Sequence, residues 1–285
     1  MAQVSRKIRK AYLRLLPPEI RRRFLARYPN LRKSAPDGIQ FVFDHYLGDI
    51  RVNVDTHFTV EKYMWTGCYD AGLTTLLRRH VRPGHVCIDV GANAGPITLL
   101  LARQVGDDGR VVAVEAAPPT YRRLLANLSL NPMLSGRVKA LNIGAGRESG
   151  TLYWNEESDN PGNGWLGTSG TESVRIVTLD SIVHDNALDR LDFIKIDVEG
   201  MEYDVFLGAR GSLQRFQPMV FFETLARFKN SGGKGNFDRI AQLLSELDYE
   251  LYRLGRSATL TKTTVNHLGA NTVAISRSNA GELAR

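Results

Sequence analysis

A strand, a tight turn and a helix follow one another in the segment that most constrains how this chain can fold. Val86–Val90 is an apolar run with one acid, Asp89, as expected for a buried parallel strand, which need not alternate polar and apolar residues. Gly91–Gly95 contains only small or turn-forming residues, and the apolar run 97–102 follows at once. A parallel strand that turns this tightly into a helix N-terminus forms the usual cradle for a nucleotide-like ligand.

The residues of this turn indicate which ligand the cradle holds. A dinucleotide-binding turn would read Gly-x-Gly-x-x-Gly, whereas this one reads Gly91-x-Asn93-x-Gly95, with Asp89 two residues before its first glycine. A carboxylate at that point suits a cationic ligand better than a pyrophosphate. S-adenosylmethionine (SAM) carries a sulfonium and an ammonium group and has no phosphate. We therefore predict a SAM-binding turn formed by Asp89, Gly91, Ala92, Asn93 and Gly95.

A second carboxylate supports this prediction. Glu115 ends the next apolar strand, 111–114, and lies 24 residues after Gly91. In a Rossmann-like sheet, an acid at the carboxyl end of the neighbouring strand can accept hydrogen bonds from both ribose hydroxyls. Asn142, near the end of the strand predicted over 138–143, joins the cofactor-binding candidates. The alternatives are two strand-end acids that only cap turns, and an NAD enzyme.

Strands and helices alternate along the rest of the chain, which has 285 residues and ordinary globular composition, with 43% hydrophobic and 24% charged residues. The pattern predicts a seven-stranded class I methyltransferase-type sheet with helices on both faces. Its last strand, 272–276, would pair antiparallel with 249–254 in a C-terminal hairpin. We expect a basic arm and a short strand ribbon over 1–65, a catalytic domain over 66–277, and a disordered tail over 278–285.

One long segment, 155–173, is predicted to be a 19-residue loop. It contains Trp165, and a tryptophan in a polar loop generally covers something flat. A sugar ring is one such partner, and packing back onto its own domain is the other interpretation.

The net charge of +7 is concentrated at the N-terminus. Residues 1–33 contain eleven Lys or Arg against Glu19 alone, so this arm carries +10 and the remainder −3. A solvated basic helix is the favoured interpretation, and peripheral contact with an anionic membrane is the functional one. Two cysteines offer no disulfide framework, and no segment resembles a signal peptide or a transmembrane helix, so we expect a cytoplasmic protein.

A second informative cluster lies in the segment 191–202. In a strand, Lys195, Asp197 and Glu199 would share one face, and a charged face in mid-sheet is costly to bury unless its members pair or act. Asp197 would lie at the carboxyl end of a strand adjacent to the first one, beside the expected ligand. The structural alternative is an internal Lys195–Asp197 ion pair, with Glu199 at the start of a helix cap.

Three motifs together resemble the FkbM family of SAM-dependent methyltransferases: Asp-Val-Gly-Ala-Asn-x-Gly at 89–95, Thr-Leu-Asp at 178–180 and Ile-Lys-Ile-Asp-Val-Glu-Gly-x-Glu at 194–202. The likeness runs from about Gly67 to Glu223. It implies a class I fold and methyl transfer to oxygen, commonly a hydroxyl of a sugar, glycolipid or polyketide. One departure is Asp70, where the family pattern has glutamate, so the cofactor entrance could differ.

The resemblance also implies roles for individual residues. It assigns SAM contacts to five of them and places two more at the active site. The SAM contacts are Asp89, Gly91, Asn93, Gly95 and Glu115, and the active-site residues are Asp197 and Glu199.

The leading hypothesis is an O-methyltransferase for a small-molecule or glycan acceptor. One alternative is a nucleic-acid methyltransferase guided by the basic arm. The chain lacks the Asn/Asp-Pro-Pro-Tyr signature of amino-nitrogen methylation, and its aromatic residues do not interleave with the basic run, so we expect no nucleic-acid partner. A non-catalytic, membrane-docked SAM-binding protein is the other alternative.

Two mechanisms are compatible with the second cluster. In the favoured one, Asp197 is the general base that takes the proton of the acceptor hydroxyl. In the other, Asp197 and Glu223, at the ends of neighbouring predicted strands, share a divalent ion such as Mg²⁺. Glu199 could complete either arrangement. No denser acid cluster marks a dedicated metal site, and the acceptor and oligomeric state stay open.

Overall fold

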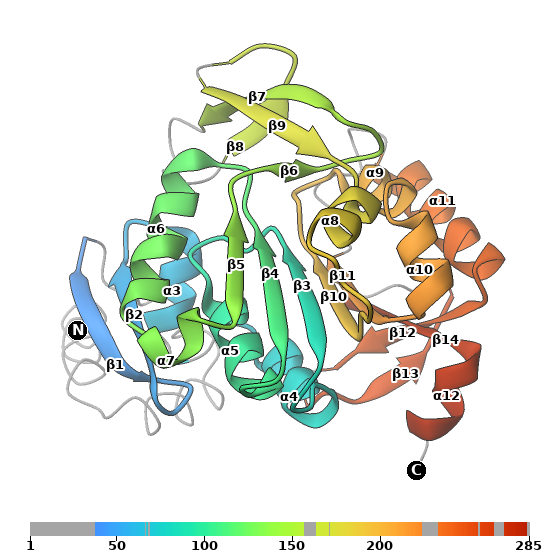
Figure 1. Ribbon diagram of the computed structural model, residues 1–285, viewed down its shortest axis with the longest axis horizontal. Coiled ribbons are helices and arrows are strands. Elements are labelled where there is room, and N and C mark those ends of the chain that lie inside the picture. The colour runs from blue at the N-terminus through green and yellow to red at the C-terminus, as the bar shows by residue number, and fades with distance from the viewer. Residues whose placement is uncertain are drawn as a thin grey trace, which may run out of the picture.

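The computed structural model of the chain describes residues 38–65, 67, 69–156, 164–170, 172–223, 233–255, 257–264 and 271–283. The basic arm over 1–33 lies outside these residues, so its predicted helix and membrane contact stay predictions. Figure 1 shows a large twisted sheet between two layers of helices, with a smaller sheet beyond one edge.

The large sheet contains eight strands in the order β13-β12-β14-β11-β10-β3-β4-β5. Five of them are parallel: β3 (Val86–Val90), β4 (Arg110–Val114), β5 (Val138–Leu141), β10 (Phe193–Ile196) and β11 (Met219–Glu223). The other three are antiparallel to their neighbours: β14 (Asn271–Ser276), β12 (Tyr249–Leu254) and β13 (Leu260–Lys262).

The predicted class I arrangement is confirmed, including the antiparallel pairing of β14 with β12. The predicted count of seven strands is one too low, because the short β13 adds a partner to the outer edge of β12. The predicted third strand also ends earlier than expected, so Asn142 lies in the loop beyond β5.

Helices cover both faces of the large sheet. One face carries α3 (Thr59–Trp65), α4 (Ala71–His80), α5 (Pro96–Val105), α6 (Pro118–Ser129) and the short α7 (Pro132–Ser135). The other carries α8 (Leu179–Asp185), α9 (Glu202–Leu207), α10 (Arg210–Phe216) and α11 (Gly233–Glu246).

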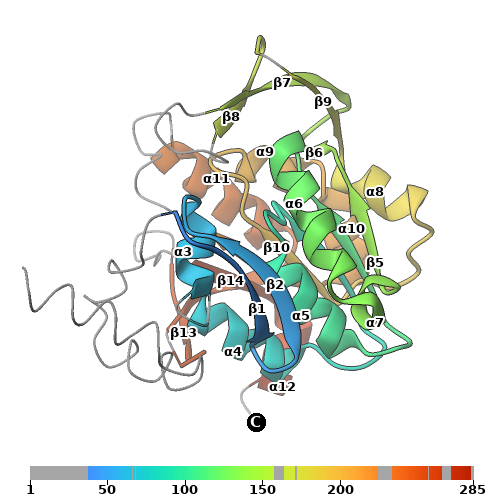
Figure 2. The ribbon, with the colours of Figure 1, turned by 90° about the vertical axis from the view of Figure 1, so that its left-hand side faces the viewer.

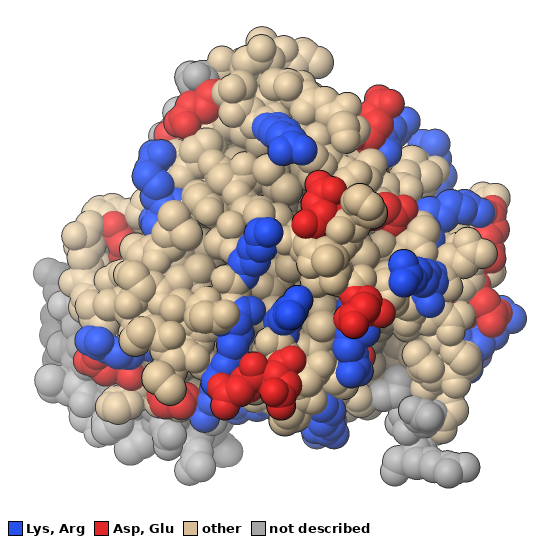
Figure 3. All heavy atoms as spheres, viewed as in Figure 1, with Lys and Arg blue, Asp and Glu red and all other residues tan. Residues whose placement is uncertain are grey.

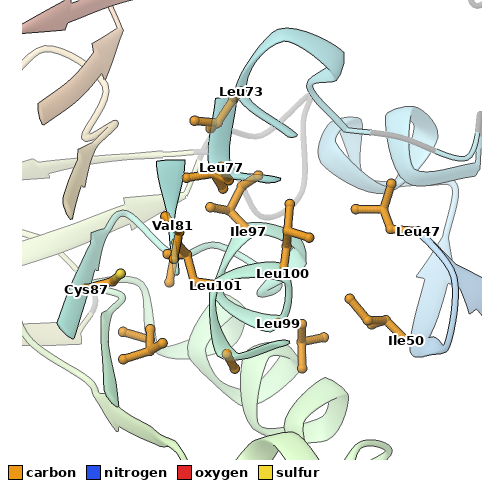
Figure 4. Packing of buried hydrophobic residues seen from close by; sticks show 14 of the residues in the cluster. Leu47, Ile50, Leu73, Leu77, Val81, Cys87, Ile97, Leu99, Leu100 and Leu101 are labelled. Carbon is orange, nitrogen blue, oxygen red and sulfur yellow. The ribbon is translucent and has the colours of Figure 1, made fainter. Parts of the chain in front are cut away.

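Alternate residues of each central strand enter the two helical layers. Within β3, Cys87 packs into the first layer, whose leucines from α4 and α5 appear in Figure 4, while Ile88 packs into the second. Because both faces are buried, even Asp89 is enclosed, and this explains the continuous apolar sequence of the strand.

The predicted N-terminal ribbon is confirmed as β1 (Gln40–Tyr46) paired antiparallel with β2 (Ile50–Asp55). It lies against the first helical layer (Figure 2) and contributes Ile50 and Val52 to the same core. Two asparagines attach it. Asn131 Oδ1 accepts from the Arg51 N–H at 2.8 Å while its Nδ2 donates to the Arg51 carbonyl at 2.6 Å, and Asn127 Oδ1 accepts from the Asn53 N–H at 2.7 Å.

The prediction of one long loop over 155–173 is wrong. Most of its described residues belong to a four-stranded sheet of order β6-β9-β7-β8, formed by β6 (Gly144–Ala145), β7 (Gly150–Glu156), β8 (Gly164–Gly167) and β9 (Glu172–Val177). The polar composition misled the prediction, because one face of this sheet is exposed and only the other packs on apolar residues. In Figure 1 the sheet lies beyond the carboxyl ends of β3, β4 and β5.

We expected a disordered tail over 278–285, but its residues up to 283 belong to a helix, α12 (Arg277–Leu283). Ala280 packs against the core, and Ser278 and Asn279 donate to the side chain and the carbonyl of Gln217. Within the described part of the chain, no helix combines the length and apolar character needed to cross a bilayer. Basic and acidic side chains are interspersed on the face seen in Figure 3.

Candidate active site

The predicted cofactor turn connects β3 to α5 and requires two of its glycines. Gly91 and Gly95 have φ angles of +78° and +88°, which disfavour other residues. A Cβ on Gly91 would overlap the carbonyl oxygen of Asp197, and one on Gly95 would lie 2.6 Å from Leu124 Cδ1. The backbone N–H groups of Gly91 and Ala92 both donate to the Val114 carbonyl at 2.9 Å. The turn is thereby attached to β4 and closely packed on the end of β10.

Asn93, Glu115 and Asn142 meet beside this turn. The Asn93 N–H donates to Glu115 Oε2 at 2.8 Å, and the Ala117 N–H donates to Oε1 at 2.9 Å. Glu115 is only 8% exposed, and burial raises its pKa although the two hydrogen bonds oppose that rise. Asn142 Nδ2 donates to the carbonyls of Glu115 and Ala116 at 2.8 and 3.1 Å, so it fixes the backbone that carries the carboxylate.

Asp89 lies behind the turn and is completely buried. Its Oδ2 accepts from Thr98 Oγ1 at 2.6 Å, and its Oδ1 lies 3.2 Å from Lys195 Nζ. The sequence predicted a direct contact between this carboxylate and SAM. The described geometry instead encloses it, because β3 is covered on both faces, and its charge acts on the site through Lys195.

Lys195 connects the cofactor turn to Asp197. Its Nζ donates to the Gly91 carbonyl at 2.8 Å and lies 3.4 Å from Asp197 Oδ2. Burial lowers the pKa of this ammonium, but the charges of Asp89 and Asp197 raise it more, so the net shift is upward. The ion pair that we considered as a structural alternative is therefore present, and it also joins the two predicted halves of the site.

Asp197 and Glu223 lie side by side at the ends of β10 and β11, as predicted. The parallel register places Ile196 beside Phe222, so the next residue of each strand projects from the same edge of the sheet. Both carboxyl groups line one pocket, and the charge of Asp197 acts on Glu223. Burial raises the pKa of Glu223 well above its usual range, and the negative charges of Asp197 and Glu199 raise it further.

The two carboxyl groups open onto a small pocket. Its lining is formed by Tyr69, Asp70, Leu73, Lys195, Asp197, Phe221, Glu223 and Asn271. Across the described ranges, no three His, Cys, Asp or Glu side chains are arranged to hold a metal ion.

Four wall residues of this pocket come from the start of α4 and from β14: Tyr69, Asp70, Leu73 and Asn271. Asp70, the departure from the family pattern, caps α4 by accepting from the Leu73 N–H at 2.8 Å, and its Oδ2 accepts from Asn271 Nδ2 at 2.6 Å. Burial raises the pKa of Tyr69, and the charges of Asp197 and Glu223 add to the rise, so its hydroxyl stays protonated.

Sequence reasoning missed Tyr69 and Asn271. An aspartate directly before a predicted helix could have marked the N-cap and drawn attention to Tyr69 beside it. Asn271 is 201 residues from Asp70, and no local pattern reveals their contact.

Glu199 is not on a shared strand face, so that prediction is wrong. β10 ends at Ile196, and Glu199 lies in the following turn with φ +54° and an exposed side chain. The buried Glu202 stabilises this turn, because its Oε1 accepts from the N–H groups of Val198 and Gly200 at 3.3 and 3.1 Å. The charge of Glu199 nevertheless acts on Tyr69 and Glu223, which places it at the rim of the pocket.

Trp165 lies on the outward face of the small sheet and is 58% exposed. The inward face carries Trp154, which packs with Ala117 and Val174 directly beyond Glu115. The small sheet therefore packs with its inner face on the segment directly after Glu115. Contact between Trp165 and a sugar stays a prediction.

These residues fit SAM. Each oxygen of Glu115 accepts one backbone N–H, which leaves each oxygen capacity for a ribose hydroxyl. The buried charges of Asp89, Lys195 and Asp197 sum to a net negative value, which suits a cationic ligand. When bound, SAM supplies an activated methyl group at this edge of the sheet.

Comparisons with known proteins agree with this chemistry. Methyltransferase sdnD of Sordaria araneosa is 27% identical in an alignment 188 residues long, which covers 54% of this chain and 69% of sdnD. Hexuronic acid methyltransferase AglP of Haloferax volcanii is 29% identical over 141 residues, 49% of this chain and 56% of AglP. The crystal structure of methyltransferase FkbM from Methylobacillus flagellatus KT has 17% identity and a TM-score of 0.45, covering 78% of this chain and 55% of that chain.

The methyltransferase FkbM domain, as a family profile, matches residues 89–251, which is more than half of the chain. The match begins at the buried acid of the cofactor turn and includes both motifs of the site. The chain therefore belongs to the FkbM family of SAM-dependent methyltransferases.

Proposed function

We propose that this protein transfers the methyl group of SAM to a hydroxyl of a sugar, a glycan or glycolipid, or a polyketide-type natural product. The observation that carries the proposal is the position of Asp197. Its carboxylate lines the pocket and is paired with the buried Lys195. The Gly91 turn packs against the backbone carbonyl of Asp197 itself, so the predicted base lies next to the predicted cofactor turn.

Asp197 addresses the remaining chemical requirement of such a transfer. An aliphatic hydroxyl is a poor nucleophile until its proton leaves, and a carboxylate within hydrogen-bond reach can take that proton. The hydroxyl oxygen forms a bond to the methyl carbon, the carbon–sulfur bond breaks with its electron pair going to sulfur, and the proton passes to Asp197. The sulfonium loses its positive charge and Asp197 loses its negative charge, so the net charge of the site is unchanged.

The relatives support the acceptor class without naming the acceptor. AglP is a hexuronic acid methyltransferase by its name, which makes a hexuronic acid the first acceptor to test.

The test is methyl transfer from labelled SAM to a panel of hydroxylated glycans and to cell extracts, followed by product mass. Asp197→Asn should reduce turnover by about 10²- to 10⁴-fold while leaving SAM affinity largely intact. Asp185→Asn, an exposed position on α8, is the matched control and should behave like wild type.

Two results would contradict the proposed mechanism. Near-normal turnover of Asp197→Asn with a verified acceptor would show that Asp197 is structural. Loss of activity on chelation, restored only by Mg²⁺, would replace direct base catalysis by the metal mechanism.

A further inference from the structure

The pocket side chains form two rows across three adjacent strands. In one row Lys195 on β10 lies beside Phe221 on β11, which lies beside Val273 on β14. In the next row, at the open edge, Glu223 lies beside Asn271, and on its other side Asp197 follows the end of β10 and lines the same pocket. Because residues two apart on a strand share a face, both rows face α4 and the same pocket.

Among the described residues, the buried cation of this cluster is Lys195, and its charge is already paired. Lys195 lies 3.2 Å from Asp89 and 3.4 Å from Asp197 and donates to the Gly91 carbonyl. Asp197 is therefore the pocket carboxyl group that is paired with the buried ammonium.

The other groups that face Glu223 do not favour a second anion beside Asp197. Glu199 in the turn after β10 is negative, and Asp70 before α4 is negative. Tyr69 keeps its proton, and Asn271 on β14 is a neutral amide. Two carboxyl groups that line one small pocket cannot both ionise without a large cost, and the pKa of Glu223 is raised accordingly.

We infer that Asp197 and Glu223 hold one proton between them, and that the protonated Glu223 is a positioning residue that donates a hydrogen bond to the Asp197 carboxylate. This inference rests on the proposed role of Asp197 as the base. Glu223 then holds the Asp197 carboxylate from the β11 side, and Lys195 holds it from the other side. The lone pairs of Asp197 that neither residue uses are left to accept the proton of the acceptor hydroxyl. The proton taken from the acceptor resides on Asp197 and leaves to solvent before the next turnover, while the Glu223 proton is retained.

The inference predicts different outcomes for two substitutions of Glu223. A residue that works as a neutral donor should be replaceable by glutamine, whereas a base or a metal ligand should not. Glu223→Gln should keep turnover of the wild-type order, and Glu223→Leu, which lacks a donor, should lose about 10- to 100-fold in kcat with less effect on KM.

The pH profile separates this role from a structural one. As the pH rises through the pKa of Glu223, the wild-type pair becomes a dianion, the donor is lost, and kcat should fall. Glu223→Gln cannot ionise, so its kcat should stay on a plateau over that range. Equal alkaline limbs in the two proteins, or inactivity of a folded Glu223→Gln, would overturn the inference.

An infrared titration of the full-length protein tests the shared proton without any acceptor. We expect the wild type at neutral pH to show the carbonyl band of a protonated carboxyl group, and Glu223→Gln to lack it. Subtracting the spectrum of Glu223→Gln from that of the wild type removes the contributions of Glu115 and Glu202, which are also buried. In Asp197→Asn the band should persist but titrate at lower pH, because a negative neighbour has been removed. Absence of the band in the wild type at neutral pH would refute proton sharing, whereas failure to find an O-methylated product would refute only the proposed function.

Discussion

Asn127 provides a sharp test of whether the N-terminal ribbon supports the cofactor turn. Its side chain is 1% exposed and bridges two distant backbone groups. Oδ1 accepts from the Asn53 N–H of β2 at 2.7 Å, and Nδ2 donates to the Ala94 carbonyl inside the turn at 2.7 Å. Replacement by leucine, which has a similar size, removes both bonds and leaves a buried donor and a buried acceptor without these partners.

The magnitude follows from the two hydrogen bonds. Each buried group that loses its partner costs about 1–3 kcal/mol, so the pair costs about 2–6 kcal/mol. Burial of the leucine side chain offsets about 1.5–3 kcal/mol of this, and a net loss of roughly 0.5–3 kcal/mol in the free energy of unfolding remains. Because the Ala94 carbonyl belongs to the turn, SAM affinity should also fall, by about tenfold for each 1.4 kcal/mol of lost preorganisation.

Asn131→Leu is the matched control. Asn131 binds both backbone groups of Arg51 on the same ribbon, and its third bond goes to the carbonyl of Asn127, not to the turn. Chemical denaturation should show lower stability for both variants, and calorimetric titration should show weaker SAM binding for Asn127→Leu only. Wild-type SAM affinity in a destabilised Asn127→Leu would refute the link, and equal weakening in both variants would assign the effect to the ribbon as a whole.

Three further predictions address the cofactor, the arm and pH. Glu115→Ala should weaken SAM binding by about 1.5–3 kcal/mol in calorimetric titration, whereas Glu148→Ala, at an exposed position, should not; unchanged affinity would exclude the ribose contact. Deletion of residues 1–33 should preserve methyl transfer to a soluble acceptor but reduce binding to anionic vesicles, and loss of turnover in a folded truncation would show that the arm contributes to the acceptor site. The raised pKa of Glu223 means that the folded state binds its proton more tightly than the unfolded state, so this group lowers stability as pH rises from the ordinary glutamate range towards its folded value. Glu223→Gln should therefore melt above the wild type at pH 8 by a margin that shrinks towards pH 5, and a constant margin would contradict the assignment.

The local parts of the site were predictable because their causes are local. A buried strand followed by Gly91-x-Asn93-x-Gly95 can only turn sharply into a helix, since the positive φ angles that the turn needs are available to these residue types. The position of Glu115 follows from the same reasoning, because consecutive parallel strands end at the same edge of a sheet. Asp197 and Glu223 were placed together by this rule as well.

The wrong predictions share a cause. The segment 155–173 was assigned to a loop from its polar composition, yet its strands need only one apolar face to pack on Ala117 and Val174. The tail was assigned to disorder, yet contacts with Gln217 and the core support α12. In both cases distant residues supply the packing partners, and a local pattern does not contain them.

Sequence by itself determined the fold class, the cofactor turn and the strand ends that carry Glu115, Asp197 and Glu223. Only the tertiary structure decided what those side chains do. Lys195 reaches a carbonyl 104 residues away, and Asp89 is completely buried because β3 is covered on both faces. The protonation of Glu223 likewise depends on the desolvation and the neighbouring charges that folding assembles around it, because the energy of a charge is set by its surroundings and not by its position along the chain.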